Sequence, residues 1–121
     1  MWNLKQTLLF DRKLKRWAKK HPDELQATFD NLDTYHEHLN SGLPAPLIQL
    51  GCIHHEPQGL KAIDQKGGGA NLAQTRLYVF PDESTDTLHL ITLGDKNSQK
   101  SDLKECADFI GKLKKGNSHG H

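Results

Sequence analysis

The chain has 121 residues, of which 35% are hydrophobic and 26% charged, and its formal net charge is +1. This length fits one domain, and the clustering of the apolar residues argues against wholesale disorder. The net charge gives no overall basic signal for nucleic acid. No apolar run reaches the length of a membrane span, and residues 1–10 lack a signal-peptide pattern, so we expect a cytoplasmic protein with no membrane partner.

The first 40 residues predict a short strand followed by two helices. Residues 6–10 are a short apolar segment that indicates an edge strand. Asp11 is a good N-cap for a helix over residues 12–20, which ends at His21 because the residue before proline avoids the α region. A second helix over 22–40 is predicted from apolar residues spaced by three and four.

The remaining chain predicts four more strands and a last helix. The strands are expected at residues 47–54, 60–65, 74–80 and 87–93. A hairpin loop over 81–86 joins the last two, and the glycines at 67–69 mark another loop. Ser98 or Ser101 can cap a helix over 101–114, and residues 116–121 are expected to be a disordered tail. The order predicts one α+β domain over 1–115, a small antiparallel sheet covered on one face by two N-terminal helices and one C-terminal helix.

Cysteine and histidine spacing predicts neither a metal site nor a cofactor. Cys52 and Cys106 lie far apart in the sequence, and we expect two buried thiols. No set of His, Cys, Asp and Glu has metal-ligand spacing. His54, His55 or His89 could act as a general acid or base, since histidine titrates near neutrality. The simpler interpretation of each is a surface or half-buried histidine on a strand.

Charge is unevenly distributed along the chain. Residues 1–21 hold seven Lys and Arg against one Asp, whereas residues 22–58 hold six acids and no Lys or Arg. Six of the basic residues fall in the predicted helix over 12–20, a plausible footprint for an RNA phosphate backbone that includes Arg12, Lys13 and Arg16. A solvated helix face, neutralised by its acidic neighbour, is equally consistent with this pattern.

The strongest local pattern lies in the C-terminal half. A strand bearing Arg76 is followed by a hairpin, a strand ending in Gly94-Asp95-Lys96, and then a helix. With the basic first helix and the long second helix, this order resembles the RelE/ParE/HigB toxin superfamily over nearly the whole chain. The resemblance implies a RelE-like fold and a metal-independent mRNA endonuclease, the toxin of a toxin–antitoxin pair. Its implied partners are a small antitoxin protein and RNA, free or on the ribosome.

The resemblance also implies roles for individual residues. Arg76 stands where ribonuclease members have an arginine that contacts RNA phosphate and stabilises the transition state. Asp95 and Lys96 stand where the family often has polar, acid–base or phosphate-binding side chains. Lys61 and Lys66 stand roughly where some members place basic residues. An exposed ion pair of Arg76 with an acid of the hairpin loop is the structural alternative.

Cleavage by an attacking 2′-OH requires a base, an acid and cations that stabilise the phosphorane. Arg76 suits the last role, because its guanidinium stays charged and forks onto phosphate, and Lys96 or Lys66 could assist it. The base could be His89, His55, Asp95 or a lysine. Many ribonuclease members have Tyr or His after the glycine, which is absent here. Two other functions therefore stay open: a non-enzymatic ParE-like inhibitor that binds DNA gyrase, and a diverged domain that only binds a partner.

Overall fold

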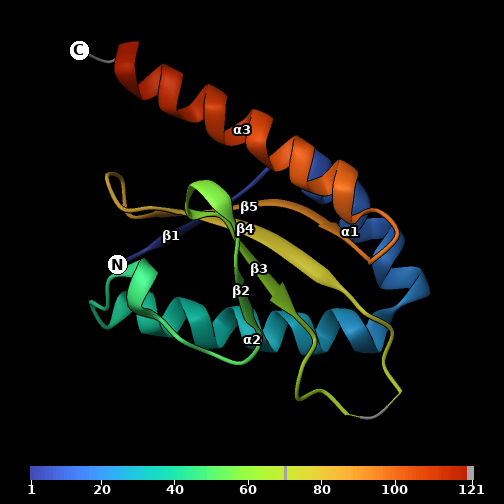
Figure 1. Cartoon of the computed structure of the whole chain (residues 1–121). Helices are drawn as coiled ribbons and strands as arrows, with labels where there is room; N and C mark the ends of the chain where they lie inside the picture. The colour runs from blue at the N-terminus through green and yellow to red at the C-terminus, as the bar shows by residue number, and fades with distance from the viewer. Residues whose placement is uncertain (70, 120–121) are drawn as a thin grey trace.

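A computed structural model describes residues 1–69 and 71–119 of the chain. The described residues form an α+β domain with a five-stranded mixed sheet, which confirms the predicted class (Figure 1). The elements are β1 (Asn3–Gln6), α1 (Leu8–Lys20), α2 (Pro22–Asn40), η1 (Ala45–Leu47), β2 (Ile53–His55), η2 (Pro57–Gly59), β3 (Lys61–Asp64), β4 (Arg76–Asp82), β5 (Thr87–Gly94) and α3 (Gln99–His119), where η marks a 3-10 helix. No helix in this part of the chain is both long and apolar enough to cross a membrane.

The sheet has the strand order β1-β5-β4-β3-β2. β4 pairs antiparallel with β5, as predicted, and β3 and β2 continue the antiparallel pairing. The prediction of an entirely antiparallel sheet is wrong, because β1 runs parallel to β5, with Asn3 opposite Thr87 and Gln6 opposite Leu90. A parallel pair needs a long connection between its strands, and here all the other strands and two helices lie between β1 and β5.

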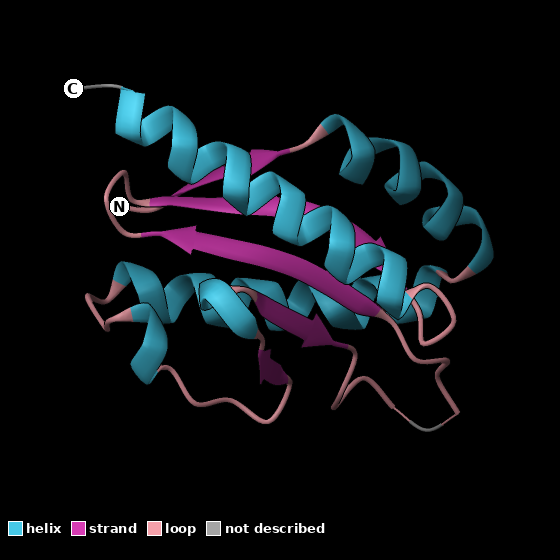
Figure 2. Cartoon of the chain, turned by 45° about the horizontal axis from the view of Figure 1, so that its top comes forward, coloured by secondary structure: helices cyan, strands magenta, loops and turns pink. Residues whose placement is uncertain are grey.

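Helices cover both faces of the sheet, so the prediction that they share one face is wrong. Along β4, Leu77 and Val79 pack in the core formed with α1 and α2, whereas Tyr78 and Phe80 pack in the core formed with α3. Figure 2 shows α3 crossing over the strands, with α2 on the far side of the sheet. Apolar residues at consecutive strand positions are typical of a strand buried on both faces.

The first strand lies earlier than the predicted range of 6–10: it covers Asn3–Gln6, and α1 begins at Leu8. Thr7, rather than Asp11, caps the helix: its hydroxyl accepts from the Phe10 N–H at 3.0 Å and donates to the Ile91 carbonyl at 2.6 Å. The cap therefore also joins α1 to β5 and lets Phe10 enter the core as a helical residue.

Several other boundaries differ from the predictions. β4 includes Pro81 and Asp82 of the predicted hairpin loop, so that only residues 83–86 lie between the two strands. Of the predicted strand over 47–54, only Ile53 and His54 belong to a strand, because the proline-containing η1 and a turn precede them. The long helix over 22–40 is confirmed. The last helix begins at Gln99 and continues through the predicted tail as far as His119, and residues 120 and 121 lie outside the described residues.

Candidate active site at the strand ends

Arg76 opens β4, where three strands end side by side. It lies opposite Asp64 of β3 and Gly94 of β5. Because these strands alternate in direction, the end of β3, the start of β4 and the end of β5 meet at one end of the sheet. This arrangement brings Lys66, Arg76 and the loop with Asp95 and Lys96 to the same region.

His54 and Asp64 form a hydrogen-bonded pair beside Arg76. Their Nε2 and Oδ2 atoms lie 2.7 Å apart, and the other carboxylate oxygen of Asp64 accepts from the Lys66 backbone N–H at 2.8 Å. The His54 side chain is 33% exposed and that of Asp64 is 9% exposed. In the register, His54 lies opposite Ala62, and Ala62 opposite Tyr78, so His54 faces the same side of the sheet as Arg76. A carboxylate that holds one ring nitrogen leaves the other nitrogen to take or give a proton.

The guanidinium of Arg76 is held by a neutral side chain. With its amide oxygen turned toward Arg76, Gln74 accepts from Nε at 3.1 Å and from Nη2 at 3.2 Å. The acids of the hairpin loop follow the opposite end of β4, seven residues long and therefore about 20 Å away. The alternative ion pair between Arg76 and these acids is therefore wrong.

The two lysines predicted at this end lie at the surface, and the aspartate shapes a turn. Lys66 and Lys96 are exposed, and Lys66 Nζ reaches the Gly51 carbonyl at 3.4 Å. Asp95 Oδ1 accepts from the backbone N–H groups of Asn97 at 2.9 Å and Ser98 at 3.1 Å. Asp95 therefore fixes the loop that carries Lys96.

Two predicted site residues lie elsewhere. His89 is 5% exposed in the α3 core, five residues before Gly94, with its ring 5.3 Å from that of Phe109. His89 and Gly94 are therefore about 16 Å apart along the strand. Burial lowers the pKa of His89. Lys61 is 5% exposed and lies on the opposite face, with Nζ 2.8 Å from His55 Nδ1, and burial lowers its pKa. Neither residue reaches Arg76, which leaves His54 as the histidine of this site.

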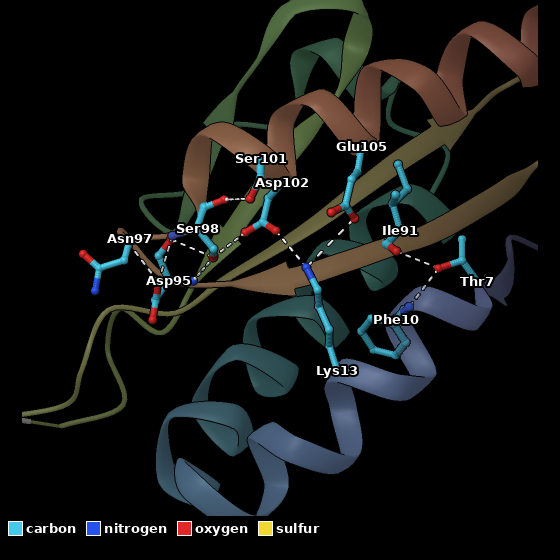
Figure 3. A network of polar contacts seen from close by, with 10 residues as sticks. All are labelled: Thr7, Phe10, Lys13, Ile91, Asp95, Asn97, Ser98, Ser101, Asp102 and Glu105. Atoms are coloured by element: carbon cyan, nitrogen blue, oxygen red, sulfur yellow. Dashed lines mark hydrogen bonds and ion pairs between the residues drawn. The ribbon is translucent and has the colours of Figure 1, made fainter.

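A polar network ties the loop to α1 and α3 (Figure 3). Asp102 of α3 is fully buried, and it accepts from Lys13 Nζ at 2.8 Å and from the Ser98 hydroxyl at 2.7 Å. Gly94 lets α3 approach, since a Cβ at this position would collide with the side chains of Asp102 and Ser98. Lys13, predicted to bind RNA, is therefore committed to an internal ion pair.

A cleft of about 290 Å³ lies between α1 and the same loop. Its lining residues are Lys13, Arg16, Trp17, Lys20, His21, Leu93, Asp95 and Ser98. Three residues of α1 were predicted to bind RNA. Arg16 and Lys13 line the cleft, although Lys13 is also paired with Asp102, and Arg12 is exposed outside the cleft. The Trp17 indole N–H donates to Thr75 Oγ1 at 3.3 Å, which connects the cleft to the residue before Arg76.

Comparisons with models of protein families, with curated proteins and with solved structures found no match. Cys52 and Cys106 are both buried free thiols. Within the described ranges, no group of three or more His, Cys, Asp and Glu side chains could hold a metal ion.

Proposed function

We propose that this chain is a metal-independent endoribonuclease of the RelE-like toxin type, neutralised in the cell by a small antitoxin protein. The proposal is supported by the order of strand, two helices, antiparallel strands and helix, which agrees with the sequence resemblance. The observation that carries it is the position of Arg76 between the His54–Asp64 pair and the Gly94–Lys96 loop. A cation and a candidate base thus stand at the same end of one sheet face.

In this proposal the RNA supplies its own nucleophile. His54, oriented by Asp64, removes the proton from a 2′-OH, and the 2′ oxygen forms a bond to the adjacent phosphorus. The bond from phosphorus to the 5′ oxygen breaks, which yields a 2′,3′-cyclic phosphate and a 5′-hydroxyl end. Lys66 or Lys96 gives a proton to the departing 5′ oxygen. Arg76 stabilises the phosphorane with its fork of N–H donors.

Cleavage of a labelled RNA by wild type and by Arg76→Ala tests the proposal. We expect Arg76→Ala to lower the cleavage rate by roughly 10²–10³-fold, because the loss of one donor to a transition-state oxyanion costs ~2–4 kcal/mol. Arg76→Lys should restore little, since a point charge cannot replace the fork. Lys112→Ala is the matched control, because it removes one positive charge from an exposed position of α3.

The chemical signature separates this reaction from contamination and from metal-dependent cleavage. Products should end in a 2′,3′-cyclic phosphate, a chelator should not slow the reaction, and His54→Ala should slow it because the proposed base is removed. Equal rates for wild type and Arg76→Ala, with both proteins folded, would exclude this site.

One observation favours a non-enzymatic alternative. The position after Gly94 holds Asp95, whose carboxylate oxygen is already occupied by two backbone N–H groups of its own turn. A protein that inhibits by binding a partner, such as DNA gyrase, needs no acid or base there. Growth arrest with DNA-damage signalling and intact mRNA would support this alternative.

A further inference from the structure

We propose that the cleft between α1 and the Asp95–Ser98 loop binds one nucleotide of single-stranded RNA, at the end of the sheet that also carries Arg76. Its phosphate would lie on Arg16 and Lys20, and its base against Trp17 and His21. Naming RNA as the ligand rests on the proposed function, whereas the site itself rests on its charge, shape and aromatic lining. Its volume of about 290 Å³ lies at the small end of ligand sites, which suits one nucleotide.

The cleft holds two cations that form no ion pair with any described residue. Arg16 and Lys20 are four residues apart and therefore lie on one face of α1. In the described part of the chain neither takes part in an ion pair, whereas Lys13, one turn earlier, is bound to Asp102. A guanidinium and an ammonium so spaced suit the oxygens of a phosphodiester.

Aromatic rings line the same cleft. The Trp17 and His21 ring centroids are 5.3 Å apart and the ring planes are tilted by 47°. The bond from the Trp17 indole N–H to Thr75 fixes the orientation of the indole. Aromatic faces beside a positively charged groove are the usual means of binding single-stranded nucleic acid with little sequence preference.

The cleft opens at the same end of the sheet as the proposed cleavage site but on its α1 face, where Leu93 packs, whereas Arg76 and His54 face the α3 side. Thr75 precedes Arg76, and the lining residues Leu93 and Asp95 flank Gly94, which lies opposite Arg76 in the register. The carboxylate of Asp95 repels a phosphate, which orients the phosphate of the bound nucleotide toward α1. A strand held at Arg76 therefore has to pass over the end of the sheet beside Gly94 to reach the cleft.

Tryptophan fluorescence tests this site without cleavage. Trp2→Phe leaves Trp17 as the single tryptophan, and a short 2′-O-methyl oligoribonucleotide, lacking a free 2′-OH, serves as the probe. We expect saturable quenching of Trp17. Arg16→Ala/Lys20→Ala in this background should weaken binding between about tenfold and a hundredfold, since a charge-assisted contact contributes about tenfold. The slope of log affinity against log salt should fall by about 0.7, because the two cations share one phosphate.

The matched control is Lys15→Ala/Lys19→Ala, which removes the same charge from exposed positions of α1 that do not line the cleft. We expect its affinity to stay within about twofold of the parent, as for charges that contact no phosphate. Equal losses in the two double variants, or binding that leaves Trp17 fluorescence unchanged, would overturn the assignment. Saturable quenching by this probe without any cleavage of unmodified RNA would support the cleft and refute the proposed reaction, so failure of the reaction and failure of the cleft give different results.

Discussion

Replacing Lys13 by Met should destabilise the protein far more than a change at an exposed lysine. Lys13 Nζ lies 2.8 Å from the carboxylate of Asp102, whose side chain is fully buried. Removing one partner of a buried ion pair leaves an uncompensated charge and typically costs about 3–5 kcal/mol. The lower end applies here, because the Lys13 side chain is 21% exposed and Ser98 continues to donate to Asp102. A loss of about 3 kcal/mol is a large part of the stability of a typical domain, about 5–15 kcal/mol.

Urea unfolding followed by circular dichroism measures this loss, and a second substitution identifies its cause. Asp102→Asn in the Lys13→Met background removes the unpaired charge while keeping an oxygen that accepts from Ser98. We expect this double variant to recover most of the loss, to within about 1 kcal/mol of wild type. Lys15→Met, on the same helix but exposed, should change the free energy of unfolding by less than about 0.5 kcal/mol.

The reasoning would be refuted if Lys13→Met cost less than about 1 kcal/mol, the value of an exposed ion pair. It would also be refuted if the double variant were no more stable than Lys13→Met alone. In either case, the connection between α1 and α3 would depend on apolar packing and not on the ion pair.

Three further outcomes are expected. Gly94→Ala should lower stability by about 1–3 kcal/mol in thermal unfolding, since the new methyl group meets Asp102 and Ser98, whereas Gly111→Ala in the open part of α3 should be neutral or stabilising. Burial lowers the pKa of His89 below 6.5. Between that lowered value and pH 6.5 the unfolded chain therefore binds more protons than the folded chain, so the free energy of unfolding is fully present above pH 6.5 and falls as the pH drops below it. His89→Phe should flatten this fall in unfolding experiments across pH. Expression without an antitoxin should slow growth with loss of translated mRNA, measured by RNA sequencing, and normal growth with intact mRNA would favour the partner-binding domain.

Elements with a strong local pattern could be predicted from the sequence. The helix over 22–40 has apolar residues at regular helical spacing, and β4 and β5 are runs of β-branched, aromatic and aliphatic residues between turn residues. The start of α1 could not be predicted, because Thr7 caps the helix while it bonds to Ile91, a contact made only in the folded chain. The parallel partner of β1 is equally non-local, since it lies more than 80 residues further along the chain.

The candidate site was predictable only in part, for a similar reason. Arg76, Lys66 and Lys96 could be placed because each lies next to a predicted strand end. The pairing of His54 with Asp64 depends on the register between β2 and β3, which the turn at η2 sets. Side-chain alternation along β2 places His54 and His55 on opposite faces of the sheet. Only the register between the strands shows that His54 lies beside the carboxylate of Asp64. His89 was misplaced because a histidine within a strand gives no sign of how far it lies from the strand end.

The parallel pairing of β1 with β5 has a consequence for the order in which the protein is made. β5 lies between β1 and β4 in the sheet, so the edge strand has no partner until residues 87–90 have left the ribosome. Until then α1 and α2 have only an incomplete sheet to pack against, and β1 exposes an unpaired edge. Pairing β1 with β5 closes a loop of more than 80 residues, and the entropy lost in closing it opposes this pairing. The nascent chain therefore cannot complete the sheet around Arg76 until the strand that joins β1 to β4 has been made.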